Sequence, residues 1–387
     1  MKSSISDKNG DIAVYVHIPF CVRKCLYCDF NSFPASGDVY ERYTEAILKE
    51  IEKNRSVIED RQIVSVYFGG GTPSLMDPGS IADILGRLNG ISYISDEAEI
   101  TMEMNPGTVT KEKIIGYKSA GVNRASIGLQ SASDKELKAL GRIHVFEDFL
   151  RSYDLIRENG ISNVSVDLMT GIPYQTIDSL MRSIDTVTSL LPEHISAYSL
   201  IIEEGTPFAK KSAGELHIPD EDETYRLYKL TRSALKSKGY ERYEISNYAK
   251  ITPDGTDYRC HHNLRYWERK DYIGFGISAA SLIGNRRYTN TSDLLTYIND
   301  PGASLEEELI LDTKEAMEEF MYLGLREIGG VSEAEFLRVF NRSIRDIYAD
   351  VIKDHIKNGL MTYSDGRLKL TDKGIDISNR VLSDYLL

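Results

Sequence analysis

Three cysteines near the start of the chain have the residue type and spacing to bind a metal cluster. Cys21, Cys25 and Cys28 lie in the run Cys-Val-Arg-Lys-Cys-Leu-Tyr-Cys, and the chain has only four cysteines. Thiolates are the soft ligands that hold iron–sulfur clusters, so this run predicts such a cluster. A cubane with four irons has one more corner than this loop has cysteines. The remaining iron is open to a small molecule, which makes the cluster a chemical site as well as an electron store.

Two other uses of these cysteines fit the sequence less well. A zinc site would need a fourth ligand nearby, and neither histidine nor cysteine follows Cys28 closely. A disulfide is disfavoured by the odd number of cysteines in the loop and by the lack of a secretory signal. The iron–sulfur cluster therefore explains the run best.

The composition is that of an ordinary soluble globular protein. The 387 residues are 41% hydrophobic and 27% charged, enough for two or three domains or for one large barrel with an appendage. The formal net charge of −13 argues against a dedicated nucleic-acid binder, whose surface should be basic. No apolar stretch approaches the ~20 residues of a membrane span, and the N-terminus lacks the apolar core of a signal peptide. We therefore expect a cytoplasmic protein, for which peripheral contact with a membrane is still allowed.

Strand-like and helix-like segments alternate over the first half of the chain. The expected strands are residues 13–18, 64–68, 99–104, 124–129, 163–168 and 194–200. Helical runs lie between them, such as 40–53, 111–120, 146–158 and 179–190. This alternation predicts an α/β fold in which a parallel sheet curls into an incomplete (β/α)6 barrel. Such barrels place function at the carboxyl ends of the strands, and the cysteine loop directly follows the first strand.

The expected strands each have one apolar and one polar face, because successive side chains on a strand point to opposite sides. The polar faces carry Tyr15 and His17 in the first strand, Glu103 in the third, Gln130 in the fourth and Asp167 in the fifth. A closed barrel usually fills its interior with branched apolar side chains. Because uncompensated burial of such polar groups is costly, the pattern predicts an open interior that holds a polar ligand. Hydrogen bonds among these residues would explain any one of them, but explain the repeated pattern less well.

A glycine-rich loop follows the second expected strand, with the sequence Gly69-Gly70-Gly71-Thr72-Pro73. Glycines allow a ligand to approach the backbone closely and leave N–H groups free to bind it. The loop lacks the G-K-[ST] ending of a P-loop. We expect it to bind a ligand at the same end of the barrel as the cysteines.

The order of the expected elements changes near residue 301, where alternating strands and helices give way to consecutive helices. Helices are expected at 313–325, 332–340 and 344–358, followed by a hairpin of 360–363 and 367–370 around an Asp-Gly turn and by a last helix from Thr371. Helices followed by a small hairpin resemble a winged helix. From residue 301 onward there are seventeen acidic residues against eleven Lys and Arg, which disfavours DNA binding. We expect a first domain over residues 1–295 and a winged-helix-like lid or docking domain over 301–387.

Together these motifs resemble the HemN-like (coproporphyrinogen dehydrogenase) branch of the radical S-adenosylmethionine (SAM) proteins, nearly from end to end. In that superfamily a C-x3-C-x2-C run holds a [4Fe-4S] cluster and SAM chelates the open iron. The resemblance implies that Cys21, Cys25 and Cys28 ligate the cluster. It implies SAM contacts for Tyr15 beside the sulfonium, Tyr27 on the adenine, the loop residues Gly70, Gly71 and Thr72, and further for Glu103, Gln130, Arg142 and Asp167. A second SAM site of the branch corresponds loosely to Gly71 and residues 197–199.

Two departures separate this chain from the dehydrogenases of that branch. The dehydrogenases carry a fourth cysteine two residues after the third, where this chain has Phe30, and a longer N-terminal arm than the twenty residues before Cys21. Both features instead resemble the HemW heme-chaperone subfamily. The run His262-Asn263-Leu264-Arg265-Tyr266-Trp267 also matches that subfamily's H-N-x-x-Y-W motif, which is associated with heme binding. The motif lies in the expected extension of the first domain.

The residue types of this motif suit a heme. A neutral imidazole is a common axial ligand of heme iron, and Tyr266 and Trp267 offer apolar surface for a porphyrin face. We therefore expect His262 to contact heme. Cys260 and His261 are its neighbours, so the choice of ligand among the three stays open. The simpler alternative is that a histidine beside aromatic residues is a core residue.

The resemblance implies a heme chaperone that binds heme, a [4Fe-4S] cluster and SAM. It would pass heme to acceptor heme proteins, with respiratory proteins at the membrane as candidates, and a flavodoxin or ferredoxin would reduce the cluster. SAM cleavage would then be a regulatory or vestigial capability. The alternative is an oxygen-independent coproporphyrinogen III dehydrogenase, which uses SAM cleavage to decarboxylate propionate side chains. A third alternative, a radical SAM methyltransferase, leaves the histidine motif without a role.

Overall fold

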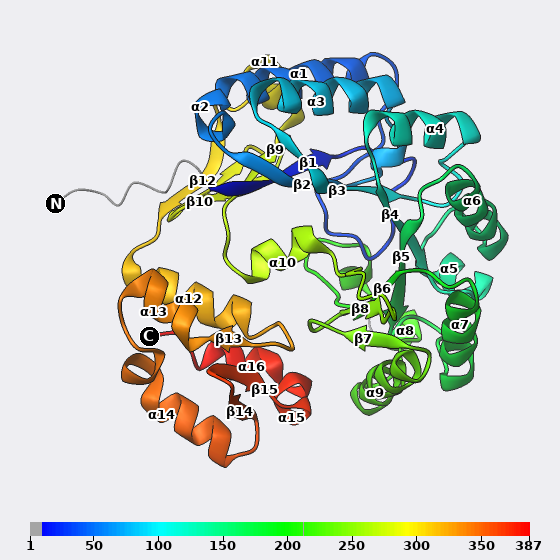
Figure 1. Cartoon of the computed structure of the whole chain (residues 1–387). Helices are drawn as coiled ribbons and strands as arrows, with labels where there is room; N and C mark the ends of the chain where they lie inside the picture. The colour runs from blue at the N-terminus through cyan, green and yellow to red at the C-terminus, as the bar shows by residue number, and fades with distance from the viewer. Residues whose placement is uncertain (1–9, 212) are drawn as a thin grey trace.

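A curved sheet with helices on its outer side forms the larger part of the computed structural model, which describes residues 10–211 and 213–387 (Figure 1). The first nine residues, included in the expected first domain and examined for a signal peptide, lie outside the described residues. Six parallel strands form the middle of this sheet: β1 (Asp11–Ile18), β2 (Gln62–Gly70), β3 (Ile94–Met104), β4 (Arg124–Gln130), β5 (Asn163–Thr170) and β6 (His194–Ser199). The predicted strands are thus confirmed, with β3 starting earlier than expected.

Helices connect these strands and cover the outer face of the sheet (Figure 1). They are α1 (Val39–Lys53), α2 (Arg55–Ile58), α3 (Pro78–Ile91), α4 (Lys111–Ala120), α5 (Asp134–Ala139), α6 (Phe146–Glu158), α7 (Ile177–Ser189), α8 (Ala213–Leu216) and α9 (Glu221–Ser237), with short 3-10 turns η1 (Pro73–Leu75) and η2 (Phe208–Lys210). Several begin at a side-chain cap; for example, Thr110 and Thr176 accept hydrogen bonds from Lys113 and Ser179 backbone N–H groups. Their buried faces and the apolar faces of the strands form one continuous core.

Further strands extend both sides of the parallel array. The complete order is β12-β11-β10-β9-β1-β2-β3-β4-β5-β6-β8-β7, and only β9 among the added strands is parallel to its neighbour β1. The added strands are β7 (Tyr240–Arg242), β8 (Asn247–Lys250), β9 (Tyr272–Phe275), β10 (Ala280–Ile283), β11 (Arg286–Asn290) and β12 (Leu305–Ile310). The two end strands of this sheet, β12 and β7, are not paired with each other. The described chain therefore forms an open α/β barrel, as the prediction of an incomplete (β/α)6 barrel requires.

Two short helices complete this part of the chain. One is α11 (Leu294–Asn299), which packs beside α1, and the other is α10 (His261–Trp267). Helix α10 lies on the inner, concave side of the sheet, between the strands and the C-terminal helices (Figure 1). Its contacts with β2 and with α12 agree with this placement. The segment that carries the H-N-x-x-Y-W motif therefore lies on the inner side of the sheet.

The C-terminal part has its own core and a small sheet of order β13-β15-β14. Its elements are α12 (Thr313–Gly324), β13 (Val331–Ser332), α13 (Glu333–Phe340), α14 (Ile344–Lys357), β14 (Met361–Ser364), β15 (Arg367–Leu370), α15 (Asp372–Asp376) and α16 (Ser378–Ser383). The predicted Asp-Gly hairpin is present, with φ values of 54° at Asp365 and 69° at Gly366. Two strands beyond residue 301 were not expected, β12 and β13, and β12 pairs with β11 of the large sheet; the strands β7 to β11 before it were not predicted either. The division at residues 295–301 stays a prediction.

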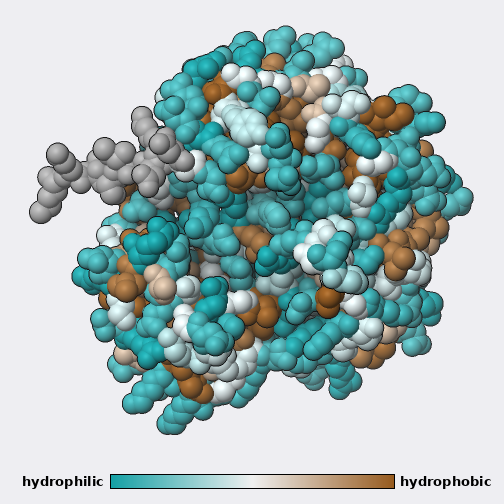
Figure 2. Space-filling view, in the orientation of Figure 1, coloured by the Kyte–Doolittle hydropathy of each residue, from teal (hydrophilic) through white to brown (hydrophobic). Residues whose placement is uncertain are grey.

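The face seen in Figure 2 is largely hydrophilic, with apolar residues in scattered patches. In the described part of the chain, no helix is both long enough and apolar enough to span a membrane.

Candidate functional site

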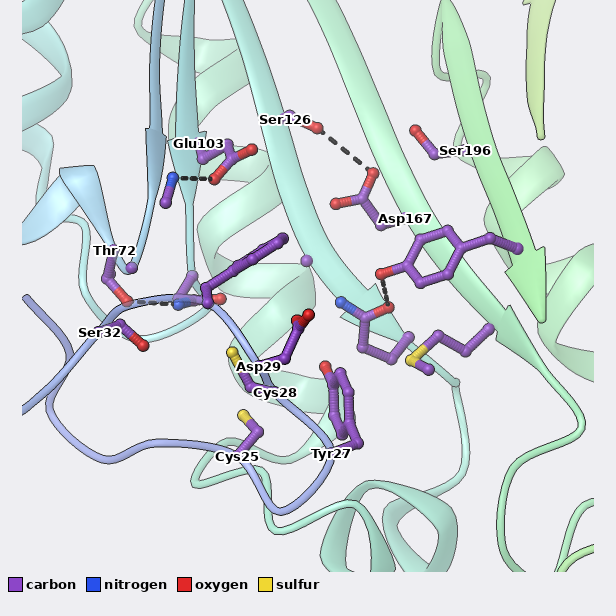
Figure 3. A pocket seen from close by; sticks show the side chains of 18 of the residues that line it. Cys25, Tyr27, Cys28, Asp29, Ser32, Thr72, Glu103, Ser126, Asp167 and Ser196 are labelled. Carbon is purple, nitrogen blue, oxygen red and sulfur yellow. Dashed lines mark hydrogen bonds between the residues drawn. The ribbon is translucent and has the colours of Figure 1, made fainter. Parts of the chain in front are cut away.

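A cavity of about 530 Å³ opens at the carboxyl ends of the parallel strands. Figure 3 looks past the cysteine loop toward the strands that carry Glu103 and Asp167. The cavity brings together most of the predicted site residues: Cys21, Cys25, Tyr27, Cys28, Gly70, Gly71, Thr72, Glu103, Gln130, Arg142 and Asp167. Tyr15 and His262 are the two predicted residues that do not line it; Tyr15 is half-buried and His262 is buried.

The cysteine loop is tied to the barrel by backbone hydrogen bonds. The Cys21 N–H donates to the Phe33 carbonyl at 3.0 Å, and the Leu26 N–H donates to the Leu140 carbonyl at 3.1 Å. All three thiols line the same cavity. In residues 10–211 and 213–387 no group of three or more His, Cys, Asp or Glu side chains is placed to share a single metal ion. Because a cubane cluster offers each thiolate a separate iron, the donor chemistry of this loop fits a [4Fe-4S] cluster.

A chain of hydrogen bonds links two of the cysteine sulfurs through neutral and cationic side chains. Thr72 Oγ1 donates to Cys21 Sγ at 3.5 Å and accepts from Asn105 Nδ2 at 2.6 Å. Arg142 Nη2 donates to Asn105 Oδ1 at 2.8 Å, and its Nη1 donates to Cys25 Sγ at 3.5 Å. These donors would stabilise negative charge on thiolates and on a cluster that they hold.

The glycine loop allows the backbone to come very close to the first strand. A Cβ atom at Gly71 would lie 2.7 Å from the Phe20 carbonyl oxygen, and one at Gly70 would overlap the His17 ring. Gly70 also has a φ of 109°, a conformation that favours glycine. The prediction that these glycines permit close backbone approach is therefore supported by geometry, whereas their contact with SAM stays a prediction.

Glu103 is one of two half-buried carboxyl groups that line the cavity; the other is Asp167. It accepts hydrogen bonds from Tyr67 OH at 2.9 Å and from the Gly70 N–H at 3.1 Å. Its pKa is raised to about 7, chiefly by burial and in part by the neighbouring Asp167, while the hydrogen bonds from Tyr67 and Gly70 lower it. A cationic ligand in the cavity would stabilise the ionised form of this carboxyl.

Asp167 and Gln130 lie on the neighbouring strands. Asp167 accepts from Ser126 Oγ at 3.3 Å, and burial raises its pKa to about 6. Gln130 accepts from Tyr198 OH at 3.0 Å and has a φ of 75° at the end of β4. Backbone strain of this kind is common at functional sites, where the surrounding structure holds a side chain in one direction. Two half-buried acids beside amide and hydroxyl groups suit a ligand that carries positive charge and several polar atoms.

Behind the cavity wall, Tyr15 connects to the cysteine loop through His17. Tyr15 OH lies 3.1 Å from His17 Nδ1, and His17 Nε2 lies 3.0 Å from the Asn31 carbonyl oxygen, which it approaches as donor. Tyr15 is therefore placed to support the loop after Cys28. Its predicted place beside a sulfonium is not seen in this geometry and stays a prediction.

His262 is 1% exposed, and both of its ring nitrogens are already hydrogen-bonded. Its Nδ1 lies 3.0 Å from Ser65 Oγ, and its Nε2 lies 2.8 Å from Tyr266 OH. Burial lowers its pKa to about 3, so the imidazole is neutral. A heme iron could bind His262 only after one of these hydrogen bonds had broken and the segment had opened. Its expected heme contact remains a prediction that this conformation does not favour.

The neighbours of His262 differ strongly in exposure. Cys260 is buried and donates to Glu99 Oε1 at 3.5 Å, whereas the His261 side chain is 50% exposed and lies 3.3 Å from Asp257 Oδ2. Tyr266 packs edge-on against Tyr272 with ring centroids 4.5 Å apart. Trp267 lies beneath the Arg326 guanidinium, 4.4 Å from the ring centroid. His261 is thus the one of the three candidate ligands whose side chain reaches solvent.

Sequence reasoning missed several residues of the site. Asn105 joins Thr72 to Arg142, and Tyr67 holds Glu103. Alternation along β2 would have indicated Tyr67, since it shares a face with Ser65 and Gly69. Nothing local distinguishes Ser196, Asn247 and Asn263, which line the cavity from β6, β8 and α10.

Comparison with known proteins agrees with this arrangement. The Radical SAM superfamily model matches residues 15–187, and the HemN C-terminal domain model matches residues 311–377. The solved structure of coproporphyrinogen III oxidase (HemN) from Escherichia coli superposes with a TM-score of 0.85 over 98% of this chain and 91% of that chain. At 21% sequence identity this likeness concerns the fold. Fold and cysteine loop therefore define a radical SAM protein, a class whose members use a [4Fe-4S] cluster and SAM.

Similarity to known relatives shows which family of radical SAM proteins the chain resembles. The chain is 35% identical over 379 residues to the heme chaperone HemW of Bacillus subtilis, covering 97% of this chain and 99% of that protein. It is 32% identical over 381 residues to the heme chaperone HemW of Escherichia coli, covering 97% and 98%. The chain belongs to the HemW family.

Proposed function

We propose that this protein is a heme chaperone that holds a [4Fe-4S] cluster and SAM in the barrel cavity, binds heme, and transfers heme to acceptor heme proteins. The observation that carries the proposal is the similarity to proteins named heme chaperone HemW along nearly the whole chain. Phe30 is consistent with it, since it stands where the dehydrogenases have a fourth cysteine and is 57% exposed.

In this proposal, different residues of the cavity bind the [4Fe-4S] cluster and SAM. Cys21, Cys25 and Cys28 would hold the cluster, which when bound supplies one-electron chemistry. The acids Glu103 and Asp167, which both line the cavity, would supply negative charge for the ammonium and sulfonium groups of SAM. Contacts of Tyr27, Gln130 and the glycine loop with SAM belong to the same proposal. A second SAM near Gly71 and residues 197–199 is part of it as well.

The heme contact is proposed within residues 260–267. His261 presents an exposed imidazole, while His262 would have to leave Ser65 or Tyr266 before it could bind iron. The proposal also includes the partners and the location of the protein. The heme acceptors include respiratory proteins as candidates, and a flavodoxin or ferredoxin would reduce the cluster. The protein would be cytoplasmic and would contact a membrane surface.

Heme titration of the anaerobically reconstituted protein tests this function. Saturable binding near one heme per chain, followed by the Soret band, and transfer of that heme to an apo-heme protein are the expected results. His261→Ala and His262→Ala identify the ligand, and His217→Ala, a histidine of the loop before α9, is the control. Absence of saturable heme binding by the wild-type protein would overturn the proposal.

The dehydrogenase alternative predicts a different product. Under anaerobic reducing conditions with SAM, it would convert coproporphyrinogen III to protoporphyrinogen, whereas the proposed chaperone would not. The structural likeness to HemN supports a shared fold, and at 21% identity it does not favour this activity over heme transfer.

A further inference from the structure

Three aromatic rings join the motif helix α10 to the half-buried acid Glu103: Tyr67, which lines the cavity, and Tyr15 and His262, which do not. The Tyr67 ring lies parallel to His262, with centroids 5.1 Å apart and an interplanar angle of 30°, and to Tyr15, with centroids 6.2 Å apart and an angle of 25°. Tyr67 OH donates to Glu103 Oε1 at 2.9 Å. The two rings therefore hold the Tyr67 ring in place, and the Tyr67 hydroxyl in turn orients the Glu103 carboxyl group.

His262 is itself fixed from three directions. Its ring nitrogens are hydrogen-bonded to Ser65 on β2 and to Tyr266 on α10, and its backbone N–H donates to Glu99 Oε1 at 3.1 Å. Glu99 is in turn 3.5 Å from the Arg124 guanidinium in a buried ion pair. A neutral, fully buried and fully hydrogen-bonded imidazole is suited to hold a neighbouring ring in place.

We propose that His262 is a positioning residue of the SAM site: it holds the Tyr67 ring so that the Tyr67 hydroxyl orients Glu103 toward the cavity. The inference rests on the part of the proposed function that puts SAM beside Glu103, and it is independent of heme. It also gives the histidine of the H-N-x-x-Y-W motif a function that requires burial rather than access to solvent. Glu103 keeps one oxygen for Tyr67 and one for Gly70, which fixes the plane of its carboxyl group.

Two replacements of His262 separate the ring from its hydrogen bonds. His262→Phe keeps a flat ring against Tyr67 and loses both hydrogen bonds, whereas His262→Gln keeps hydrogen-bonding atoms and loses the ring. SAM affinity is measured by calorimetric titration of SAM into the reconstituted holoprotein, alongside thermal unfolding of each variant. We expect His262→Gln to bind SAM about tenfold more weakly and His262→Phe within about threefold of wild type.

The chain offers a matched control in His194. This imidazole is also buried, with Nδ1 2.8 Å from Ser165 Oγ and Nε2 2.9 Å from Tyr243 OH, yet its ring contact is with Tyr243 rather than Tyr67. His194→Gln should therefore lower thermal stability to a similar extent while leaving SAM affinity within about twofold. If SAM affinity followed stability in all these variants, His262 would have only a structural role and the proposal would fail.

A double-mutant cycle tests the route through Tyr67. Tyr67→Phe removes the hydroxyl that donates to Glu103 and should weaken SAM binding about tenfold, and adding His262→Gln to it should produce little further loss. If the two substitutions weakened SAM binding additively, His262 would not act through Tyr67. If His262→Gln does not fold, His262→Asn, which also lacks the ring but keeps an amide on the side of Ser65, should still weaken SAM binding about tenfold, and unchanged affinity would overturn the proposal. If heme transfer is normal but these changes in SAM affinity are absent, only the inference about His262 is refuted. If the changes in SAM affinity are seen but the protein does not bind heme, only the proposed heme-chaperone function is refuted.

Discussion

The guanidinium of Arg142 donates a hydrogen bond to Cys25 Sγ at 3.5 Å, although the two residues are 117 positions apart in the chain. The same guanidinium donates to the Gly128 carbonyl at 2.5 Å and to Asn105 Oδ1 at 2.8 Å, so its orientation is fixed by the barrel. A permanent positive charge therefore lies beside one of the three thiolates predicted to hold the cluster. This relationship leads to the first of four predictions.

Arg142→Met should make the reduction potential of the reconstituted cluster more negative by tens of millivolts. Removing a positive charge and an N–H···S hydrogen bond destabilises the reduced, more negative form. Arg142→Lys keeps the charge and should shift the potential less. The measurement is an anaerobic redox titration followed by EPR. Arg151→Met, which changes an exposed arginine paired with Glu147, is the control, and equal potentials for Arg142→Met and wild type would contradict the prediction.

Asn105→Ala should lower the free energy of unfolding of the apoprotein by about 1–3 kcal/mol, because it removes the hydrogen bonds that the Asn105 amide makes with Thr72 Oγ1 and Arg142 Nη2. Urea denaturation followed by circular dichroism measures the change. Asn299→Ala, at an exposed position at the end of α11, should change the same quantity by no more than about 0.5 kcal/mol. Equal effects of the two substitutions would show that the link between Thr72 and Arg142 contributes nothing.

Glu103 should make the apoprotein less stable as the pH rises. Burial raises its pKa from 4.5 to about 7, so the folded state binds this proton more tightly than the unfolded state does. Its contribution to stability is therefore complete below pH 4.5 and is lost as the pH rises through about 7. The difference in unfolding free energy between wild type and Glu103→Gln should fall by about 1–3 kcal/mol between about pH 5 and pH 8.

The comparison with Glu103→Gln is needed because buried histidines act in the opposite direction. Burial lowers the pKa of His262 to about 3, so its contribution is present above pH 6.5 and is lost as the pH falls toward about 3. The raw pH profile of the wild type contains both effects. A wild-type-minus-variant difference that stays constant with pH would show that Glu103 does not titrate in this range.

Glu50→Ala should be strongly destabilising although it lies far from the cysteines. The buried Glu50 carboxyl accepts from Tyr297 OH at 2.5 Å, from Asn290 Nδ2 at 2.6 Å and from the Gly276 N–H at 2.9 Å. Removing it leaves three buried donors without their acceptor, with an expected loss of about 3–5 kcal/mol in unfolding free energy. Glu45→Ala, at an exposed position of the same helix, should cost no more than about 0.5 kcal/mol. Similar melting temperatures for the two variants would exclude this role.

The cysteine loop, the parallel strands and the polar faces could be predicted from the sequence because their signals are local. The spacing of Cys21, Cys25 and Cys28 is a property of eight consecutive residues, and the alternation that pointed Glu103, Gln130 and Asp167 inward is a property of single strands. The Asp365-Gly366 hairpin was predictable for the same reason, since a turn with positive φ at two residues favours this pair. The open barrel followed from the order of these local elements.

Only the tertiary structure decided what surrounds His262. Its partners Ser65 and Tyr67 lie almost two hundred positions earlier in the chain, and the sequence around residues 260–267 contains no sign that this helix enters the barrel. Likewise, Asn105 became part of the site because β3 brings it between Thr72 and Arg142. Burial and hydrogen bonding depend on distant segments that meet on folding, so residue type alone predicted heme contact at His262 and could not show that its imidazole is buried and hydrogen-bonded at both ring nitrogens.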